Sequence, residues 1–223
     1  MKIVSWNCNG KFREKINKIK ELDADIYVIQ ECENPEFTKN QSYKDFSAGG
    51  FWTGKIRSKG LGIFFREPSA AVKSDWHSCD FANFLPVDID EKLSLLAVWA
   101  CKPYIEGYYD YQNLNFDNYK NKDIIVIGDF NSNAMWDDKH RKKSHSAVVD
   151  ELQSIGIYSV YHRIMNEEHG KEKQNTFYMH RNKSKGYHID YCFTNIAEIK
   201  NFIIFDNSSW LEYSDHMPIL VEI

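Results

Sequence analysis

The sequence predicts an α+β layered sandwich. Strand-like segments dominate the chain, and only two or three segments show helical periodicity. The strand-like segments come in sequential runs and not as strict strand–helix–strand repeats, which favours antiparallel pairing over a doubly wound parallel sheet. The 223 residues, of which 43% are hydrophobic and 15% aromatic, are enough for a sizeable core, and we expect a single domain spanning residues 1–223.

The first half of the chain predicts one helix among several strands. Apolar residues from Phe12 to Leu22 recur at helical spacing between lysines, which predicts an amphipathic helix over residues 11–22. Runs rich in branched and aromatic residues predict strands, and we expect the later ones to pair antiparallel. These strands are expected over residues 2–6, 25–31, 60–65, 70–74, 84–90 and 93–99.

The second half of the chain also predicts helical segments among several strands. Residues 107–120 are rich in tyrosine and asparagine and are compatible with a helix or a loop. A helix is predicted over residues 144–156, because serine is a favoured N-cap and glycine commonly follows a helix end. Strands are predicted over residues 123–129, 175–180, 187–193, 199–205 and 217–223.

Composition and charge exclude some classes of protein. The net charge of -4 argues against a globally basic nucleic-acid coat, although a local basic patch can still steer a phosphate. No apolar run approaches the ~18 residues that a membrane span requires, and from the residues after Met1 we expect no signal peptide. The five cysteines are scattered without the spacing of a zinc site, so we expect free thiols and a cytoplasmic location.

Polar residues occur where several predicted strands end. The stretch GDFNSN (128–133) follows an apolar run, and in an extended chain Asp129 and Asn131 lie on the same side. Asp190 stands inside an apolar strand, where a carboxylate is costly unless it has a partner. Taken singly, each such residue also fits a turn or a solvated strand end. The other members of this set are Asn7, Glu31, His188, Asp215 and His216.

Together these residues have the chemistry of phosphoester hydrolysis. A hard divalent cation requires oxygen ligands, which Glu31 and Asp215 can supply. A hydrolytic water needs an acceptor, a role that suits Asp129. An imidazole beside a carboxylate is held in one tautomer and can stabilise charge on a phosphoryl oxygen, which suits His216 with Asp190.

Five motifs in order carry a resemblance to a known family. They are WNCNG (6–10), IQE (29–31), GDFNSN (128–133), HIDY (188–191) and SDHMP (214–218). In this order they resemble the endonuclease/exonuclease/phosphatase superfamily, the exonuclease III and DNase I-like group. The resemblance implies a four-layer αββα sandwich of two mainly antiparallel sheets flanked by helices, with the active site at one end of the sheets.

The resemblance also implies which residues handle the metal and the water. Glu31 corresponds to the main Mg²⁺ ligand, with Mn²⁺ as an alternative ion, and Asp215 to a second carboxylate on the metal side. Asp129 corresponds to the residue that aligns or activates the attacking water. The implied chemistry is metal-assisted hydrolysis by in-line attack.

The remaining motif residues are implied to act on the phosphate. Asn7 lies close to the metal and the substrate phosphate, and Asn131 helps to hold the scissile phosphate. His216 contacts a non-bridging phosphate oxygen, and Asp190 orients His216.

Two positions depart from the family's pattern. Trp99 stands where many members have a tyrosine or a histidine, and an indole offers a donor but no acceptor. A catalytic role at that position is therefore in doubt, unless Lys102 or Tyr104 substitutes. His188 stands where repair members often carry an arginine, and both substrate contact and a structural role are open for it. The chain is also short for the DNA-gripping insertions of the repair enzymes.

The choice of substrate depends on two basic segments, residues 139–143 and 180–185. Lysines and arginines in them can position a phosphate backbone, and nearby aromatic side chains can stack on bases. The alternatives are solvated loops and core packing. The candidate substrate contacts are Trp99, Trp136, Arg141, Lys142, Tyr178 and His188.

We therefore predict a Mg²⁺-dependent nuclease acting on DNA, with no membrane and no obligate protein partner. The alternative is a phosphatase or phosphodiesterase acting on a small phosphorylated molecule, which the net charge of -4 favours. A catalytically silent binding module is disfavoured because the key polar groups are all present. Residues 104–116 are left without an assigned role.

Overall fold

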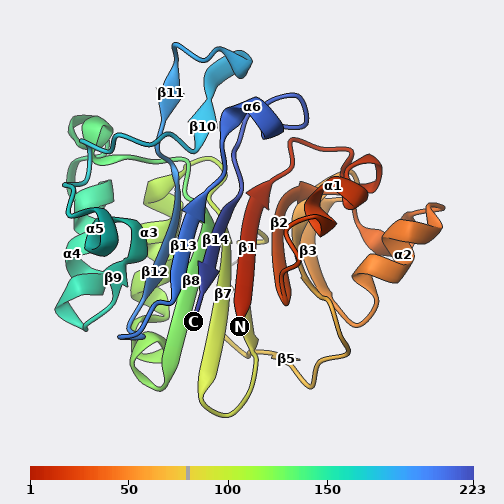
Figure 1. Ribbon diagram of the computed structural model, residues 1–223. Helices are drawn as coiled ribbons and strands as arrows, with labels where there is room; N and C mark the ends of the chain where they lie inside the picture. Colours follow the sequence, from red (N-terminus) through yellow and green to blue (C-terminus); the bar gives the residue numbers. More distant parts are fainter. Residues whose placement is uncertain (79–80) are drawn as a thin grey trace.

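Two six-stranded sheets packed face to face form the centre of the computed structural model, which describes residues 1–78 and 81–223 (Figure 1). The first sheet has the order β13 (Asn201–Ile204), β14 (Ile219–Glu222), β1 (Lys2–Asn7), β2 (Ile26–Cys32), β4 (Lys59–Phe65) and β3 (Phe51–Ile56). The second has the order β5 (Val72–Lys73), β6 (Phe84–Asp88), β7 (Leu93–Trp99), β8 (Asp123–Asp129), β12 (Asp190–Thr194) and β9 (Tyr158–Ser159).

Helices cover the outer face of each sheet. The first sheet is covered by α1 (Ile16–Lys20), α2 (Gln41–Ser47) and α6 (Asn207–Trp210), with the short helices η1 (Phe12–Glu14) and η2 (Pro35–Phe37). The second is covered by α3 (Ile105–Leu114) and α4 (His145–Ser154), with α5 (Val160–Met165), η3 (Phe116–Lys120), η4 (Ala134–Lys139) and η5 (Arg141–Lys143) nearby.

Three apolar cores separate these layers. One fills the space between the sheets, where Val28 of β2 and Ile125 of β8 belong to the same cluster. The second lies beneath α1 and α2, and the third beneath α3 and α4. Only the β1–β2 and β7–β8 pairs are parallel among the strand pairs of the described chain. The predicted αββα sandwich of two mainly antiparallel sheets is therefore confirmed.

Most predicted elements are present, with differences at their ends. The helix expected over 11–22 is divided into η1 and α1, and the one over 144–156 is α4, whose N-cap Ser144 accepts from the amide of Ala147 at 3.2 Å. Residues 107–120 form most of α3 and η3. Strand β3 has no counterpart among the predicted strands, and residues 175–180 contain only the short β10 (Phe177–Tyr178), which pairs with β11 (Gly186–Tyr187).

The free cysteines agree with the expectation drawn from their spacing. Cys8, Cys32, Cys101 and Cys192 are free thiols, and Cys79 lies outside the described residues. In the part of the chain that the structure describes, no helix is both long enough and apolar enough to cross a membrane.

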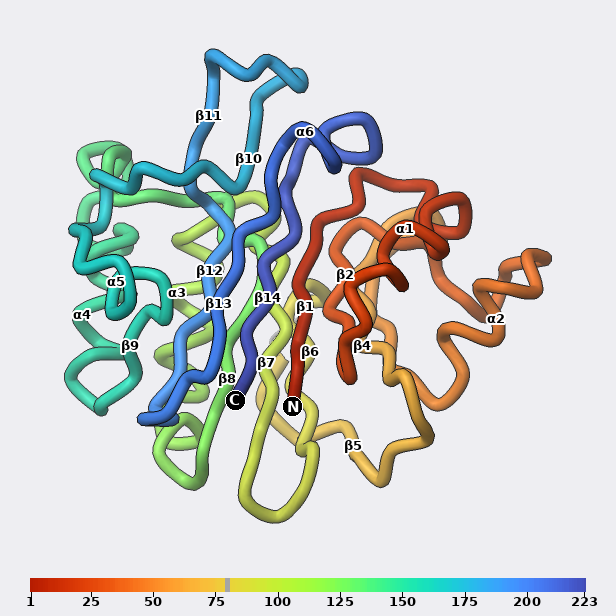
Figure 2. Tube along the Cα trace, viewed as in Figure 1, coloured from red at the N-terminus to blue at the C-terminus, as the bar shows by residue number. Residues whose placement is uncertain are grey.

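The strand ends that carry the polar motifs gather at one end of the sandwich. Strands β1 and β2 run in parallel and finish there, as does β8, while the antiparallel β12 begins there. The β10–β11 hairpin projects from this same end, at the top of Figure 2. The chain termini meet at the opposite end, where the Met1 ammonium group donates to the Ile223 carbonyl at 2.7 Å.

Candidate active site

A β-bulge at the end of β2 positions Glu31. The register of β2 against β4 shifts between Gln30 and Cys32, and Glu31 has a φ of 62°, in the left-handed region that side-chain-bearing residues rarely adopt. The bulge redirects the Glu31 carboxylate toward the site. The Asn7 carboxamide lies 3.5 Å from Glu31 Oε1, and the ammonium group of Lys59 pairs with Oε2.

Gly128 allows β8 to deliver Asp129 beside β7. Its φ is 152°, and a Cβ at this position would lie only 1.9 Å from the Val98 carbonyl oxygen. A side chain is therefore excluded by both conformation and space. The next residue, Asp129, is fully buried at the end of the strand.

Two asparagines satisfy the buried Asp129 carboxylate. Asn7 Nδ2 donates to Oδ2 at 2.9 Å, and Asn131 Nδ2 donates to the same oxygen at 3.0 Å. The backbone amide of Asn131 donates to Oδ1 at 2.9 Å, and Asn131 adopts a φ of 47°. Strand β8 ends at Asp129, so the left-handed turn at Asn131, and not strand alternation, brings the two side chains together as a single hydrogen-bonded unit.

His216 lies between two carboxylates. Its Nδ1 is 3.0 Å from Asp190 Oδ2, and its Nε2 is 3.9 Å from Asp129 Oδ2. Ser214 Oγ donates to the Asn7 carbonyl at 2.6 Å, and Trp6 Nε1 donates to the His216 carbonyl at 2.9 Å. These bonds hold the SDHMP segment against the end of β1.

The charges of this group are set by burial and proximity. Burial raises the pKa of Asp129 to about 7, although the nearby imidazole of His216 opposes the rise. Burial acts to lower the pKa of His216, but the carboxylates of Asp190 and Asp129 outweigh it and raise that pKa to about 10. The imidazolium is therefore the favoured form, with an N–H donor on both ring nitrogens.

Glu31 and Asp215 have the donor chemistry for a hard divalent cation. Both side chains are partly exposed, and Glu31 already attracts the cationic Lys59. Oxygen ligands of this kind suit Mg²⁺ or Mn²⁺. Asp129, Asp190 and His216 also have donor atoms within 4.8 Å of one another. Because these side chains are buried and His216 is hydrogen-bonded to Asp190, we interpret them as an acid–base group and not as a metal site.

Four of the candidate substrate contacts remain accessible. Trp99, at the end of β7, is half-buried and lies in register with Asp129, and Trp136 packs on Tyr187 with 5.2 Å between ring centroids. Arg141 and Lys142 are exposed on η5.

The neighbouring basic residues of the 139–143 segment are tied to α3. Lys143 pairs with Asp110 at 2.7 Å, and His140 lies 3.3 Å from Glu106. These pairs reduce the positive charge that the segment presents to solvent.

His188 and Tyr178 point into the interior instead. His188 is 3% exposed, its Nδ1 lies 2.9 Å from the Gln174 carbonyl, and its ring packs against Tyr161 with 4.5 Å between centroids. Tyr178 is 8% exposed, and its hydroxyl accepts from Asn207 Nδ2 at 2.8 Å. This burial agrees with the packing alternative for both residues and not with substrate contact.

Sequence reasoning missed two residues that support the site. Thr176 Oγ1 accepts from the amides of Ile189 and Asp190, both at 3.0 Å, and so fixes the start of β12. Lys59 pairs with Glu31 across 28 residues of sequence. Neither residue belongs to a motif, and only the folded pairing of the strands brings them to the site.

Comparison with known proteins identifies the family of the chain. A family model described as the endonuclease/exonuclease/phosphatase family matches residues 4–216. The chain therefore belongs to this family, which consists of hydrolytic phosphoesterases and nucleases. Among curated protein sequences no match is found.

Solved structures share the fold at low sequence identity. An AP endonuclease from Archaeoglobus fulgidus aligns with a TM-score of 0.74 and 18% identity, covering 100% of this chain and 99% of that one. A 3′ phosphatase, NExo, from Neisseria, bound to a product DNA hairpin, gives 0.73 and 18%, with 100% and 99% covered. The catalytic domain of Xenopus laevis APE2 gives 0.71 and 17%, with 100% and 91% covered.

Proposed function

We propose that this protein is a divalent-metal-dependent phosphodiester hydrolase acting on DNA, with the whole chain serving as one catalytic domain. The observation that carries the proposal is the environment of Asp129. A buried carboxylate is held by the carboxamides of Asn7 and Asn131 and lies beside an imidazole that Asp190 keeps charged. Few structural needs explain so many polar groups buried at one strand end, whereas phosphoester hydrolysis uses each of them.

In this proposal Asp129 orients the attacking water and accepts its proton. With a pKa near 7, the carboxylate is ionised in a large share of molecules at neutral pH and is still a competent base. The imidazolium of His216 presents its Nε2–H to a non-bridging phosphoryl oxygen, where the charge builds up. Asn131, which is partly exposed, holds the scissile phosphate, and Asn7 spans Asp129 and Glu31.

Glu31, with Asp215, would hold the Mg²⁺ or Mn²⁺ ion. When bound, that ion supplies positive charge against the phosphoryl oxygens and stabilises the leaving oxygen. Lys59 neutralises Glu31 in the absence of the cation and would move aside for it.

DNA is the favoured substrate because basic side chains surround the site's end of the sandwich. The β10–β11 hairpin, whose turn carries basic residues between 180 and 185, projects beside the strand ends (Figure 1). Arg141 and Lys142 are exposed for phosphate contact. The AP endonuclease and the DNA-bound 3′ phosphatase share the fold and support the same substrate class.

A small phosphorylated molecule is the second candidate. The net charge of -4 and the pairing of Lys143 and His140 with acidic residues of α3 favour it, because both weaken the attraction for a polyanion.

A direct assay separates the two candidates. Supercoiled plasmid and oligonucleotides with an abasic site or a 3′-phosphate are incubated with the protein and Mg²⁺ or Mn²⁺, beside an Asp129→Ala variant. We expect metal-dependent cleavage or phosphate release that the variant lacks. Inactivity on every nucleic acid, with phosphate released from sugar, inositol or nucleotide phosphates, would establish the second candidate instead.

A further inference from the structure

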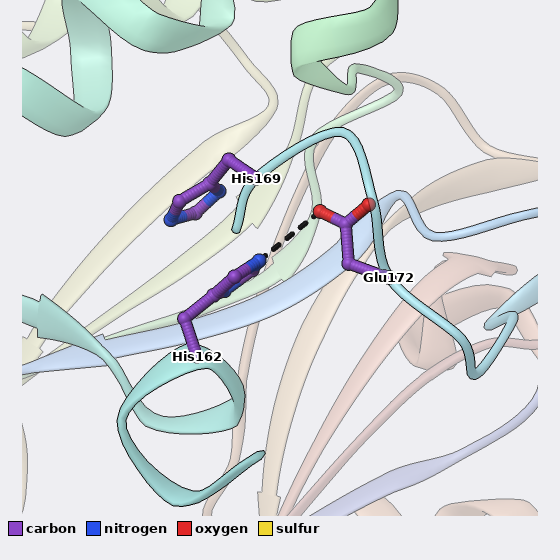
Figure 3. A group of neighbouring side chains, drawn as sticks. All are labelled: His162, His169 and Glu172. Carbon is purple, nitrogen blue, oxygen red and sulfur yellow. Dashed lines mark hydrogen bonds and ion pairs between the residues drawn. The ribbon is translucent and has the colours of Figure 1, made fainter. Parts of the chain in front are cut away.

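A second cluster of metal-ligating side chains lies apart from Glu31. His162 is on α5, and His169 and Glu172 are on the loop that follows it. In Figure 3 the His162 ring points to Glu172, and the His169 ring lies over that of His162. One donor atom from each lies within 4.8 Å of the others. His162 Nε2 is 3.1 Å from Glu172 Oε1, and the rings of His162 and His169 are stacked with 3.5 Å between centroids.

Unpartnered buried nitrogens surround this cluster. His145 is fully buried, and its Nε2 lies 3.0 Å from Nδ1 of His169. Among residues 1–78 and 81–223, no hydrogen-bond partner is present for His169 Nε2, His145 Nδ1 or His188 Nε2, and all three atoms are inaccessible to water. An unsatisfied buried polar atom costs about 1–3 kcal/mol, so the unpartnered Nε2 of His169, which belongs to the cluster, calls for a ligand.

The carboxylate of the cluster is held in place by its neighbours. The amide of Gly170 donates to both oxygens of Glu172 at 3.1 Å, and Asn133 Nδ2 donates to Oε2 at 3.0 Å. His162 Nδ1 lies 2.7 Å from Ser159 Oγ, which fixes that ring from its other side. Metal ligands are commonly oriented by this kind of outer hydrogen bond.

We propose that His162, His169 and Glu172 bind a transition-metal ion, with Zn²⁺ the best match. Two imidazole nitrogens and one carboxylate oxygen form an established donor set for Zn²⁺, whereas Mg²⁺ prefers oxygen ligands. Ligand bonds of ~2.1 Å in a tetrahedral site place neighbouring donor atoms about 3.4 Å apart. The observed 3.1 Å between His162 and Glu172 is close to that spacing. The His169 ring, which is stacked on His162 at an interplanar angle of 14°, would have to turn out of the stack to direct a nitrogen at the same ion.

The position of the cluster indicates a structural role for the ion. Asn133 belongs to the GDFNSN segment, and its carboxamide nitrogen donates to Glu172 and also to the His188 carbonyl at 2.9 Å. An ion bound to Glu172 would therefore stabilise, through Asn133, the segment that carries Asp129. Because Asn133 links Glu172 to this segment, we assign the ion a structural role.

The test measures metal binding without any substrate, so it does not depend on the proposed nuclease activity. Chelator-treated full-length protein is titrated with Co²⁺, whose visible absorption identifies four- or five-coordinate nitrogen-containing sites. We expect one equivalent of absorbing Co²⁺, displaced by stoichiometric Zn²⁺ but not by millimolar Mg²⁺, and a rise in Tm on Zn²⁺ addition. Wild-type protein with no visible Co²⁺ band would overturn the proposal, whatever the variants do.

Matched variants locate the ion. His169→Asn and Glu172→Gln should each abolish the band or weaken Co²⁺ affinity at least tenfold. His77→Asn, at an exposed histidine outside the cluster, and Glu31→Gln, at the proposed Mg²⁺ ligand, should retain it. A band that survives in both cluster variants, or is lost in Glu31→Gln, would place the ion elsewhere and contradict the assignment.

Discussion

Asp190 lies directly opposite Asp129 in the antiparallel pairing of β12 with β8, and both carboxylates face the ring of His216. The strand register thus places one carboxylate near each nitrogen of a single imidazole. His216 comes from a different sheet, beside the start of β14, so the site depends on how the two sheets pack.

Replacement of Asp190 should lower the pKa of His216. Asp190 is the main group that raises this pKa against the effect of burial, so Asp190→Asn should bring it from about 10 to a value well below that. Histidine ring signals followed by NMR across pH measure the change. Asp215→Asn, a weaker contributor, should shift the pKa less; equal shifts in both variants would contradict the assigned orientation.

Removal of the Asp129 charge should lower activity without lowering stability. Asp129→Asn keeps the shape of the side chain but removes the base, and general-base catalysis typically contributes 10²–10⁴-fold to a rate. We expect a loss of about that size in hydrolysis, with a Tm equal to or above that of the wild type, because a costly buried charge is gone. Cleavage assays and thermal unfolding test both halves. A lower Tm with retained activity would refute the assigned role.

Gly128 should tolerate no side chain. Gly128→Ala would place a Cβ against the Val98 carbonyl, and we expect a loss of at least ~3 kcal/mol in the free energy of unfolding. Gly156→Ala is the matched control, because Gly156 has a φ of 81° but open space where a Cβ would stand, which leaves only the ~1 kcal/mol conformational cost. Urea unfolding measures both variants, and similar losses would refute the steric argument.

The buried histidines should make the metal-free protein acid-sensitive. The pKa of His145 and of His169 is lowered by burial, and His162, Glu172 and Tyr191 surround them. Unfolding therefore takes up protons below a pH of about 6.5, and the free energy of unfolding should fall by about 1.4 kcal/mol per pH unit for each histidine. This loss begins near pH 6.5 and for His169 continues toward pH 3.

Urea unfolding in chelator at pH 7, 6 and 5 measures that slope. His145→Gln should give a shallower pH dependence than the wild type, while His77→Gln, at an exposed position, should leave it unchanged. Identical slopes in all three proteins would show that the cluster does not control acid stability.

Lys59 should compete with the proposed Mg²⁺ ion for Glu31. Its ammonium group pairs with the carboxylate, so Lys59→Met should lower the Mg²⁺ concentration that gives half-maximal activity by about two- to fivefold, the effect of a weak, partly exposed ion pair. Lys55→Met, at an exposed lysine of the same hairpin, is the control. A raised Mg²⁺ requirement in Lys59→Met would instead assign Lys59 to phosphate contact.

The structure brings most of the motif residues together because they end or begin neighbouring strands. Asp190 in an apolar strand has a histidine partner, as its cost there predicts. Asp129 and Asn131 do meet, but through a left-handed turn beyond β8 and not through the strand alternation that the sequence suggests. The bulge that redirects Glu31 is not predictable from the sequence, because it depends on pairing with β4, whose neighbour β3 carries no clear strand pattern.

The histidine cluster escapes prediction for a different reason. Scattered cysteines exclude only a cysteine-based zinc site, whereas His162, His169 and Glu172 lie in a polar stretch that resembles a solvated loop. Their burial arises only when this loop packs beneath the GDFNSN segment through Asn133. The closeness of two histidines and a glutamate in the sequence is the one signal that could have revealed them. His188 and Tyr178 show the converse, since aromatic and imidazole side chains fit packing and binding patterns equally.

The adjacency of β1 and β14 has a consequence for biosynthesis. Asn7 leaves the ribosome long before His216, and the Ser214 hydroxyl and Trp6 indole bonds that join their segments span 207 and 210 residues. A nascent chain therefore carries half of its reactive centre without the other half until the segment before β14 has emerged. Any hydrolase activity is thus withheld from the earlier stages of translation and appears only once both halves can meet.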